Sequence, residues 1–303
     1  MSSNGEMFSG CTVAMVTPFR DNGIDIPALR NAVDWLISEG VAGLSPAGTT
    51  GESPTLSADE HERVVATVVE RAAGRVHVVA GSGSNSTAEA VRLTRFAARA
   101  GADGALLVAP YYNRPNQDGL YAHYARIAES VDLPLVLYNV PSRTGCNIEP
   151  STVERLSRLA RIVAIKEASG SLDQVSDIVS RTDLTVLSGD DSLTLPMMAV
   201  GASGVISVAA NLVPKKIVAM IDAFVSGNLA KARELHGFLF PLCRALMEVA
   251  PNPIPVKTAL ALVGRGNGEL RLPLTPLDTR TRETLSVKLT CRGLRVLEAG
   301  AGA

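Results

Sequence analysis

The chain has 303 residues, of which 46% are apolar, 19% charged and 4% aromatic. This composition supports a large buried core and excludes disordered, collagen-like and coiled-coil proteins. Because 29 Lys and Arg residues nearly balance 30 Asp and Glu residues, the chain lacks the basic surface that binding of nucleic acid or an anionic membrane requires.

Residues 1–11 show no basic stretch followed by an apolar one, so we expect no secretory signal and a cytoplasmic protein. The four Cys and four His residues are widely spaced, without a Cys-x-x-Cys pair or the spacing of metal ligands. We therefore expect no disulfide framework, no metal and no other cofactor. The uncharged segment 192–214 is interrupted by Pro, Gly and Asn, which predicts a buried helix and strand and not a membrane span.

Short apolar segments recur along the chain, each bounded by Gly, Pro, Ser or Asp. They are nearly continuous in Val, Ile, Leu and Ala, which is typical of strands buried on both faces of a parallel sheet. The predicted strands are 12–16, 43–47, 76–80, 104–109, 135–140, 162–165, 184–187 and 204–208. Helical patterns alternate with them at 27–39, 58–73, 87–100, 117–130, 150–160, 171–181, 193–200 and 214–225.

Eight strand–helix units predict an α/β fold, the (β/α)8 TIM barrel. Three further helical stretches follow without another strand, at 229–249, 256–264 and 281–297. These predict a C-terminal helical appendage, and we expect a catalytic barrel at 1–226 and a helical domain at 227–303.

Active residues of such barrels stand where the strands end, and Lys166 is the residue there that conflicts most with its surroundings. It follows the apolar run 162–165, where loss of water disfavours the charged ammonium form. A neutral amine is what imine formation with a keto acid requires. The alternative is a lysine that pairs with Glu167 or another carboxylate.

Two other strand ends, those of 43–47 and 135–140, carry candidate residues. Tyr138 could transfer protons beside such an amine, or be a half-buried aromatic with a satisfied hydroxyl. The turn at 48–51 (GTTG) could bind a small carboxylate through its backbone N–H groups, or be a plain tight turn. Arg143 could bind a second carboxylate with its two-pronged guanidinium, or simply be solvated. The loop at 81–86 (GSGSNS) lacks the third glycine of a dinucleotide fingerprint, so we predict no nucleotide site.

Several motifs together resemble the N-acetylneuraminate lyase and dihydrodipicolinate synthase family. They are 48–52 (GTTGE), 110–115 (PYYNRP), 138–145 (YNVPSRTG), 166–168 (KEA), 188–191 (SGDD) and 251–257 (PNPIPVK), collinear from about Phe8 to Leu297. The resemblance implies a barrel enzyme that condenses pyruvate with L-aspartate 4-semialdehyde, the committed step of lysine and diaminopimelate biosynthesis.

Each residue role comes from that resemblance. It implies that Lys166 forms the Schiff base with pyruvate, and that Tyr138 moves protons through Thr49 and Tyr112. The turn at Thr50 and the backbone at Ile206 would hold the pyruvate carboxylate, and Arg143 that of the semialdehyde. The resemblance also implies that Tyr112 reaches the site of a neighbouring subunit, and therefore a homo-oligomer, at least a dimer and usually a dimer of dimers.

Two alternatives and one regulatory expectation stay open. The chain could be another pyruvate aldolase acting on a sugar acid, or a non-catalytic regulator that binds a keto acid. Feedback by L-lysine is implied by five residues at the positions of the family's lysine cleft, which are Ser53, His61, Asn85, Glu89 and Tyr111. Pro54 and Ala58 depart from that pattern, and the five residues could instead form a polar subunit interface.

Overall fold

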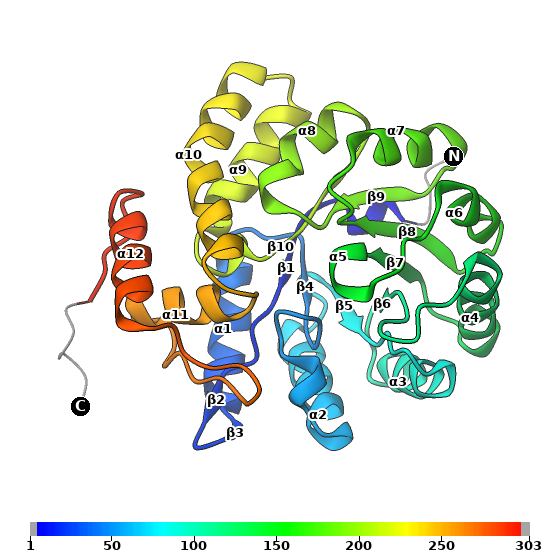
Figure 1. The fold of residues 1–303 in the computed structure, drawn as a ribbon, viewed down its shortest axis with the longest axis horizontal. Helices are drawn as coiled ribbons and strands as arrows, with labels where there is room; N and C mark the ends of the chain where they lie inside the picture. Colours follow the sequence, from blue (N-terminus) through cyan, green and yellow to red (C-terminus); the bar gives the residue numbers. More distant parts are fainter. Residues whose placement is uncertain (1–4, 298–303) are drawn as a thin grey trace.

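A closed barrel of parallel strands forms the centre of the molecule, as expected (Figure 1). The computed structural model describes residues 5–297, so the outermost parts of both predicted domains, 1–4 and 298–303, lie outside it. The barrel strands are β1 (Gly10–Ala14), β4 (Gly43–Ser45), β5 (His77–Gly81), β6 (Gly104–Val108), β7 (Leu135–Asn139), β8 (Ile162–Glu167), β9 (Thr185–Ser188) and β10 (Gly204–Ser207). Each strand pairs with its neighbour along the chain, and β1 closes the barrel by pairing with β10 and β4.

Helices surround the barrel (Figure 1). They are α1 (Ile26–Ser38), α2 (Ala58–Ala72), α3 (Thr87–Arg99), α4 (Gln117–Ser130), α6 (Pro150–Ser157), α7 (Leu172–Arg181), α8 (Thr194–Ala199) and α9 (Pro214–Val225). Local signals explain several helix starts. Ser57 and Glu60 form a reciprocal capping box at the start of α2, and α6 and α9 begin at Pro150 and Pro214, where a missing N–H costs nothing. The (β/α)8 fold predicted from the periodicity is confirmed.

Several short elements were not predicted from the sequence. The antiparallel pair β2 (Phe19–Arg20) and β3 (Gly23–Ile24) closes through two residues with positive φ, Asp21 and Asn22. A single helical turn, α5 (Pro141–Thr144), follows β7. The 3-10 turns are η1 (Glu6–Phe8), η2 (Ser53–Thr55), η3 (Asp191–Leu193) and η4 (Ala209–Asn211). Elements of two to four residues carry too few positions for a period to be recognised.

Three helices follow the barrel and lie to one side of it (Figure 1). They are α10 (Leu229–Glu248), α11 (Ile254–Leu262) and α12 (Thr279–Thr290). The last ends seven residues before the predicted limit of 297, at a turn where Gly293 has φ of 73°. A boundary between two domains at 226/227 stays a prediction. Within residues 5–297, no helix combines the length and apolarity needed to cross a membrane.

Candidate active site

Lys166 and Tyr138 lie side by side at the carboxyl ends of β8 and β7. The two residues are register partners of the adjacent strands, and Lys166 Nζ lies 4.2 Å from the centroid of the Tyr138 ring. Lys166 is 5% exposed and Tyr138 8% exposed. The predicted pairing of an amine with a phenol in an apolar strand environment is therefore present in the fold.

Glu167 does not pair with Lys166, so the part of the alternative that named Glu167 is wrong. Successive strand residues point to opposite faces, and the Glu167 carboxylate accepts hydrogen bonds from Asn139 Nδ2, the Ser169 N–H and Gln174 Nε2. Burial raises the pKa of Glu167, and these hydrogen bonds oppose the increase. No described carboxylate forms a direct ion pair with Lys166, although Asp190 and Asp191 lie near enough to interact with its charge.

The Tyr138 hydroxyl makes no hydrogen bond to any residue in 5–297. The alternative of a hydroxyl already satisfied by the protein is therefore not what the fold contains. A phenol that keeps its proton-transfer capacity, next to an unpaired amine, suits general acid–base catalysis.

The turn at 48–51 joins β4 to η2 and carries two threonines. Its ends are tied by a hydrogen bond from the Gly51 N–H to the Gly48 carbonyl, with an N···O distance of 3.1 Å. The N–H groups of Thr49 and Thr50 donate to no described acceptor. The segment is thus a tight turn, and its two N–H groups are also available to an anion.

Lys166, Tyr138, Thr49, Thr50 and Arg143 line one narrow cavity of about 60 Å³. Other lining residues are Ser45, Ser142, Gly189, Asp190, Val208, Met247 and Asn252. The cavity holds an amine, a phenol, hydroxyls and a guanidinium around a small volume. This set can bind a short keto acid and convert it to an imine.

Arg143 stands in α5, a turn held at its start by Pro141. Its side chain is exposed, yet it borders the cavity, and Nη2 donates to the Asn252 carbonyl at 3.3 Å. A purely solvated arginine is therefore not what the fold contains.

Asp190 and Asn252 also line the cavity, although no role was predicted for either residue. Burial raises the pKa of the Asp190 carboxyl, while the nearby Lys166 ammonium acts in the opposite direction. Asp190 stood within the SGDD motif at a strand end, which is the signal that could have identified it. Asn252 lies in the PNPIPVK motif at 251–257, which was part of the resemblance but for which no residue role was predicted.

Two predicted residues lie away from this cavity. Ile206, in the middle of β10, is 1% exposed and does not line it. Tyr112 is 91% exposed, has φ of 69°, and also lies outside the lining. Within one chain, Tyr112 is therefore not part of the constellation around Lys166.

A second cavity, of about 430 Å³, adjoins the first and shares Thr49, Tyr138 and Arg143 with it. Four of the five residues expected to bind lysine line it, namely Ser53, His61, Glu89 and Tyr111. The fifth, Asn85, is tied to it by a hydrogen bond from Nδ2 to the Tyr111 carbonyl at 3.1 Å. The His61 Nε2 lies 2.8 Å from the Gly81 carbonyl, and burial lowers the pKa of His61.

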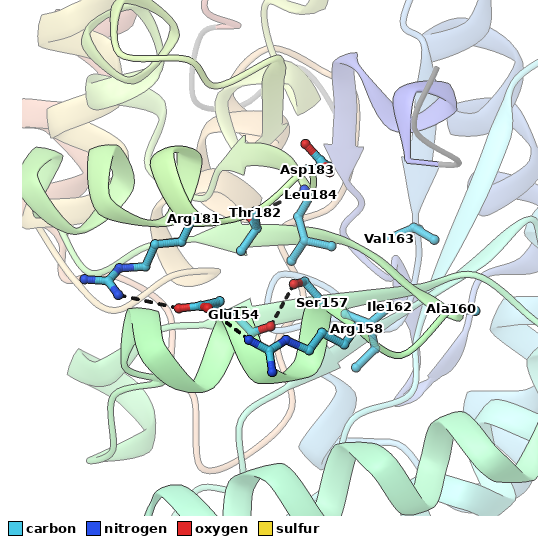
Figure 2. Close-up of a pocket in the computed structure, with 10 residues that line it drawn as sticks. All are labelled: Glu154, Ser157, Arg158, Ala160, Ile162, Val163, Arg181, Thr182, Asp183 and Leu184. Carbon is cyan, nitrogen blue, oxygen red and sulfur yellow. Dashed lines mark hydrogen bonds and ion pairs between the residues drawn. The ribbon is translucent and has the colours of Figure 1, made fainter. Parts of the chain in front are cut away.

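A further cavity, of about 440 Å³, lies at the amino ends of the barrel strands, and Figure 2 shows the residues that line it. It is bordered by the starts of β8 and β9, and by Arg158 and Arg181, which both pair with Glu154. In barrels of this kind the active site lies at the carboxyl ends of the strands, so we do not place the active site in this cavity. Within residues 5–297, no cluster of three or more His, Cys, Asp or Glu residues could hold a metal ion.

The sequence profile of the dihydrodipicolinate synthetase family matches residues 7–291. A 4-hydroxy-tetrahydrodipicolinate synthase of Thermomicrobium roseum is 54% identical over 285 residues, which cover 93% of this chain and 94% of the relative.

Solved structures agree with the sequence matches. A dihydrodipicolinate synthase of Acinetobacter baumannii, complexed with pyruvate, has a TM-score of 0.92 and 42% identity, covering 95% of this chain and 99% of that one. A dihydrodipicolinate synthase from Cyanidioschyzon merolae with lysine bound has the same TM-score and coverage, with 41% identity. A variant described as monomeric has a TM-score of 0.94 and 43% identity, covering 97% of this chain and 99% of that one.

Proposed function

The chain belongs to the dihydrodipicolinate synthetase family, and on that premise we propose that Lys166 is the amine that forms an imine with pyruvate. The activity is that of a 4-hydroxy-tetrahydrodipicolinate synthase, a lyase of lysine and diaminopimelate biosynthesis. The relatives favour this function over a sugar-acid aldolase. The observation that carries the proposal is a buried lysine without a carboxylate partner, 4.2 Å from the Tyr138 ring centroid.

The reaction begins when the Lys166 amine attacks the carbonyl carbon of pyruvate to give a carbinolamine. Loss of water forms the imine, and loss of a proton from the methyl carbon then forms the enamine. Tyr138 is the group placed to give and take these protons. The N–H groups of Thr49 and Thr50, which donate to no described acceptor, and the hydroxyls of the two threonines support binding of the pyruvate carboxylate at the adjoining turn.

The enamine carbon then attacks the aldehyde of L-aspartate 4-semialdehyde, whose oxygen takes a proton and becomes the hydroxyl. The amino group of the new chain attacks the imine carbon, closes the ring and releases Lys166. Arg143 supplies the guanidinium for the carboxylate of this second substrate, because it borders the same cavity from α5.

Trapping with borohydride tests the imine. With pyruvate present, reduction should add the mass of one reduced pyruvate to Lys166, identified by peptide mass spectrometry. Lys257 is a matched control, since it is equally buried but paired with Glu52. No addition at Lys166 would exclude a Schiff-base mechanism and would leave a non-catalytic keto-acid-binding regulator as the alternative. Turnover with N-acetylmannosamine or glyceraldehyde, but not with the semialdehyde, would contradict the assigned second substrate.

L-Lysine is the proposed effector of the second cavity. His61 donates from Nε2 to a carbonyl while Nδ1 has no partner among the described residues, so Nδ1 can accept from an ammonium group. Glu89 adds a negative charge and already accepts from the Ser84 hydroxyl at 2.5 Å. Lysine should inhibit at millimolar concentration, and Glu89→Gln should weaken inhibition while Glu70→Gln, on exposed α2 surface, should not. A rate that stays flat during lysine titration would overturn this.

The proposed assembly is a homo-oligomer, in which Tyr112 completes the site of a neighbouring subunit. Its support is the exposure of a large aromatic side chain outside its own cavity. Sedimentation velocity would measure the state of assembly.

A further inference from the structure

Asn252 lies between α10 and α11 and joins two groups of the active site. Its side-chain Nδ2 donates to Thr50 Oγ1 at 3.0 Å, and its main-chain carbonyl accepts from Arg143 Nη2 at 3.3 Å. Asn252 is 6% exposed and lines the same cavity as Lys166. The C-terminal part of the chain therefore reaches both of the groups that the proposed function assigns to carboxylates.

The direction of the Asn252–Thr50 hydrogen bond determines whether the Thr50 hydroxyl can donate its proton to a ligand. A threonine hydroxyl has one proton to donate and two lone pairs. The Asn252 amide occupies a lone pair, and no described acceptor takes the Thr50 proton. The proton therefore remains available to a ligand in the cavity, and a carboxylate is the kind of group it would bind most strongly.

Folding stability gives no clear reason for this amide. Asn252 Oδ1 is buried and has no hydrogen-bond partner within residues 5–297, and an unpaired buried acceptor destabilises a fold. Among the described residues, Thr50 is thus the only hydrogen-bond partner of the Asn252 side-chain amide.

We propose that Asn252 is a positioning residue that presents the Thr50 hydroxyl as a donor to the carboxylate of pyruvate. This inference rests on the proposed function, which places pyruvate at that turn. Asn252 acts through Thr50 and does not itself touch the reacting atoms.

A double-mutant cycle tests the proposal. Asn252→Leu should raise the KM for pyruvate about tenfold, the cost of losing one hydrogen bond to a charged group, with a much smaller change in kcat. Thr50→Val should have a similar effect, and adding Asn252→Leu to Thr50→Val should change nothing further. The KM for the semialdehyde should stay unchanged, because the main-chain bond to Arg143 remains.

Asn267→Leu is the matched control, since Asn267 belongs to the same C-terminal part of the chain and donates to the Phe19 carbonyl, outside the cavity. It should leave both KM values unchanged. If Asn252→Leu fails to fold, Asn252→Asp is the second variant, because a carboxylate lacks the N–H and captures the Thr50 proton. It should give the same selective increase.

Three results would overturn the inference: an unchanged KM for pyruvate, effects of the two substitutions that multiply independently, or an equal rise in both KM values. Borohydride trapping distinguishes a wrong role for Asn252 from a wrong proposed function. Wild-type protein that is not labelled at Lys166 refutes the proposed function. Wild-type and Asn252→Leu proteins labelled with the same dependence on pyruvate concentration refute only the role of Asn252.

Discussion

Lys166 and Lys257 are two buried lysines whose neighbours differ. Both are buried and both lie 4.2 Å from an aromatic ring centroid, that of Tyr138 or of Phe19. Lys257 also meets the buried Glu52 carboxylate at 2.5 Å, whereas Lys166 has no such partner among the described residues. Burial alone does not create a nucleophile. A direct ion pair is what distinguishes Lys257 from Lys166, the lysine that we propose as the nucleophile.

Tyr138 offers a test of proton transfer at the scale of one atom. Tyr138→Phe removes the hydroxyl and keeps the ring beside Lys166, so kcat should fall about 10²- to 10⁴-fold. Tyr124→Phe is the control, because Tyr124 is fully buried in α4 and its hydroxyl lies 3.4 Å from the Leu107 carbonyl, outside the cavity. Steady-state kinetics measure both. A Tyr138→Phe enzyme with nearly full kcat would remove Tyr138 from the mechanism.

The buried His123 should make the free energy of unfolding depend on pH. Burial lowers its pKa from 6.5 to about 4, so below pH 6.5 the unfolded chain binds a proton that the folded chain does not. Stability should therefore fall as the pH drops from about 6.5 to 4, by up to about 1.4 kcal/mol per pH unit from this residue.

His123→Asn removes the titration, and its amide can replace Nδ1, which lies 2.9 Å from Thr87 Oγ1. Urea unfolding at several pH values should show a shallower slope for this variant across that window. Equal slopes for the two proteins would contradict the lowered pKa, whatever the absolute stability of the variant.

At the scale of elements, long periodic segments could be predicted and short or non-local ones could not. The limits of all eight barrel strands agree with the predicted ones within two residues, because strands buried on both faces read as uninterrupted apolar runs. The strand ends then located Lys166 and Tyr138. The position of Asn252 in the site could not be predicted, because its partner Thr50 is 202 residues away in the sequence. A local sequence pattern does not indicate a contact over such a separation.

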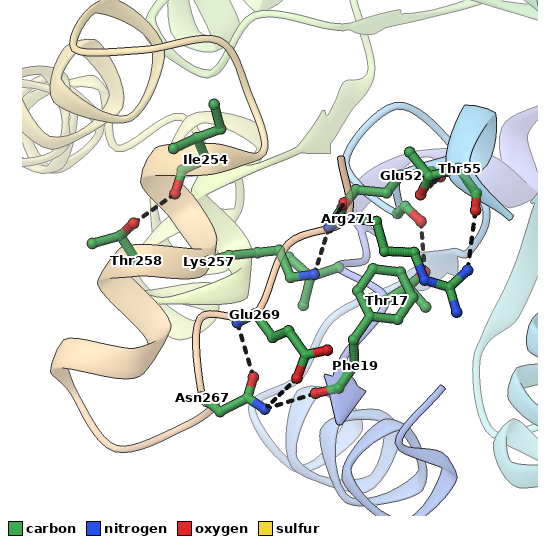
Figure 3. A network of polar contacts seen from close by, with 12 residues as sticks. Thr17, Phe19, Glu52, Thr55, Ile254, Lys257, Thr258, Asn267, Glu269 and Arg271 are labelled. Carbon is green, nitrogen blue, oxygen red and sulfur yellow. Dashed lines mark hydrogen bonds and ion pairs between the residues drawn. The ribbon is translucent and has the colours of Figure 1, made fainter. Parts of the chain in front are cut away.

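Glu52 and Lys257 join the loop after β4 to α11, as Figure 3 shows with the surrounding polar network. Breaking a buried pair from one side leaves an unpaired charge, so Lys257→Met should cost about 3–5 kcal/mol of unfolding free energy. Adding Glu52→Gln should recover part of this loss, because the uncompensated charge is removed. Urea denaturation measures both.

Lys231→Met supplies the comparison for that prediction. Lys231 pairs with Glu234 on the exposed surface of α10, where an ion pair contributes about 0–1 kcal/mol. Should Lys257→Met prove as mild as Lys231→Met, the buried pair would not be what fastens α11 to the barrel.

At the scale of the whole molecule, the C-terminal part of the chain returns to the mouth of the barrel. Arg271 pairs with Glu60 at 2.6 Å, and this guanidinium holds the pKa of Glu60 at about 2. Glu269 accepts from the N–H groups of Asp21 and Asn22 in the β2–β3 turn. These contacts connect residues more than 200 positions apart, so the segment after α11 is tied to the β2–β3 turn and to α2.

The exposed Tyr112 allows a test of whether neighbouring subunits share an active site. Lys166→Ala and Tyr112→Phe proteins should each be nearly inactive. If Tyr112 serves a neighbouring subunit, mixed oligomers contain one site with an intact Lys166 and a Tyr112 from the other chain. After subunit exchange, an equal mixture should therefore recover about a quarter of the wild-type rate in a two-fold symmetric pair.

The control mixture combines Lys166→Ala with Tyr138→Phe. Tyr138 and Lys166 pair within one chain, so every site in mixed oligomers still lacks one of them, and no activity should return. Recovery only in the Tyr112 mixture would place that side chain in the partner's site, because exchange can repair only a function shared between chains. Sedimentation of the wild-type protein as a monomer, or no recovery in either mixture, would instead leave the exposed Tyr112 without a catalytic role.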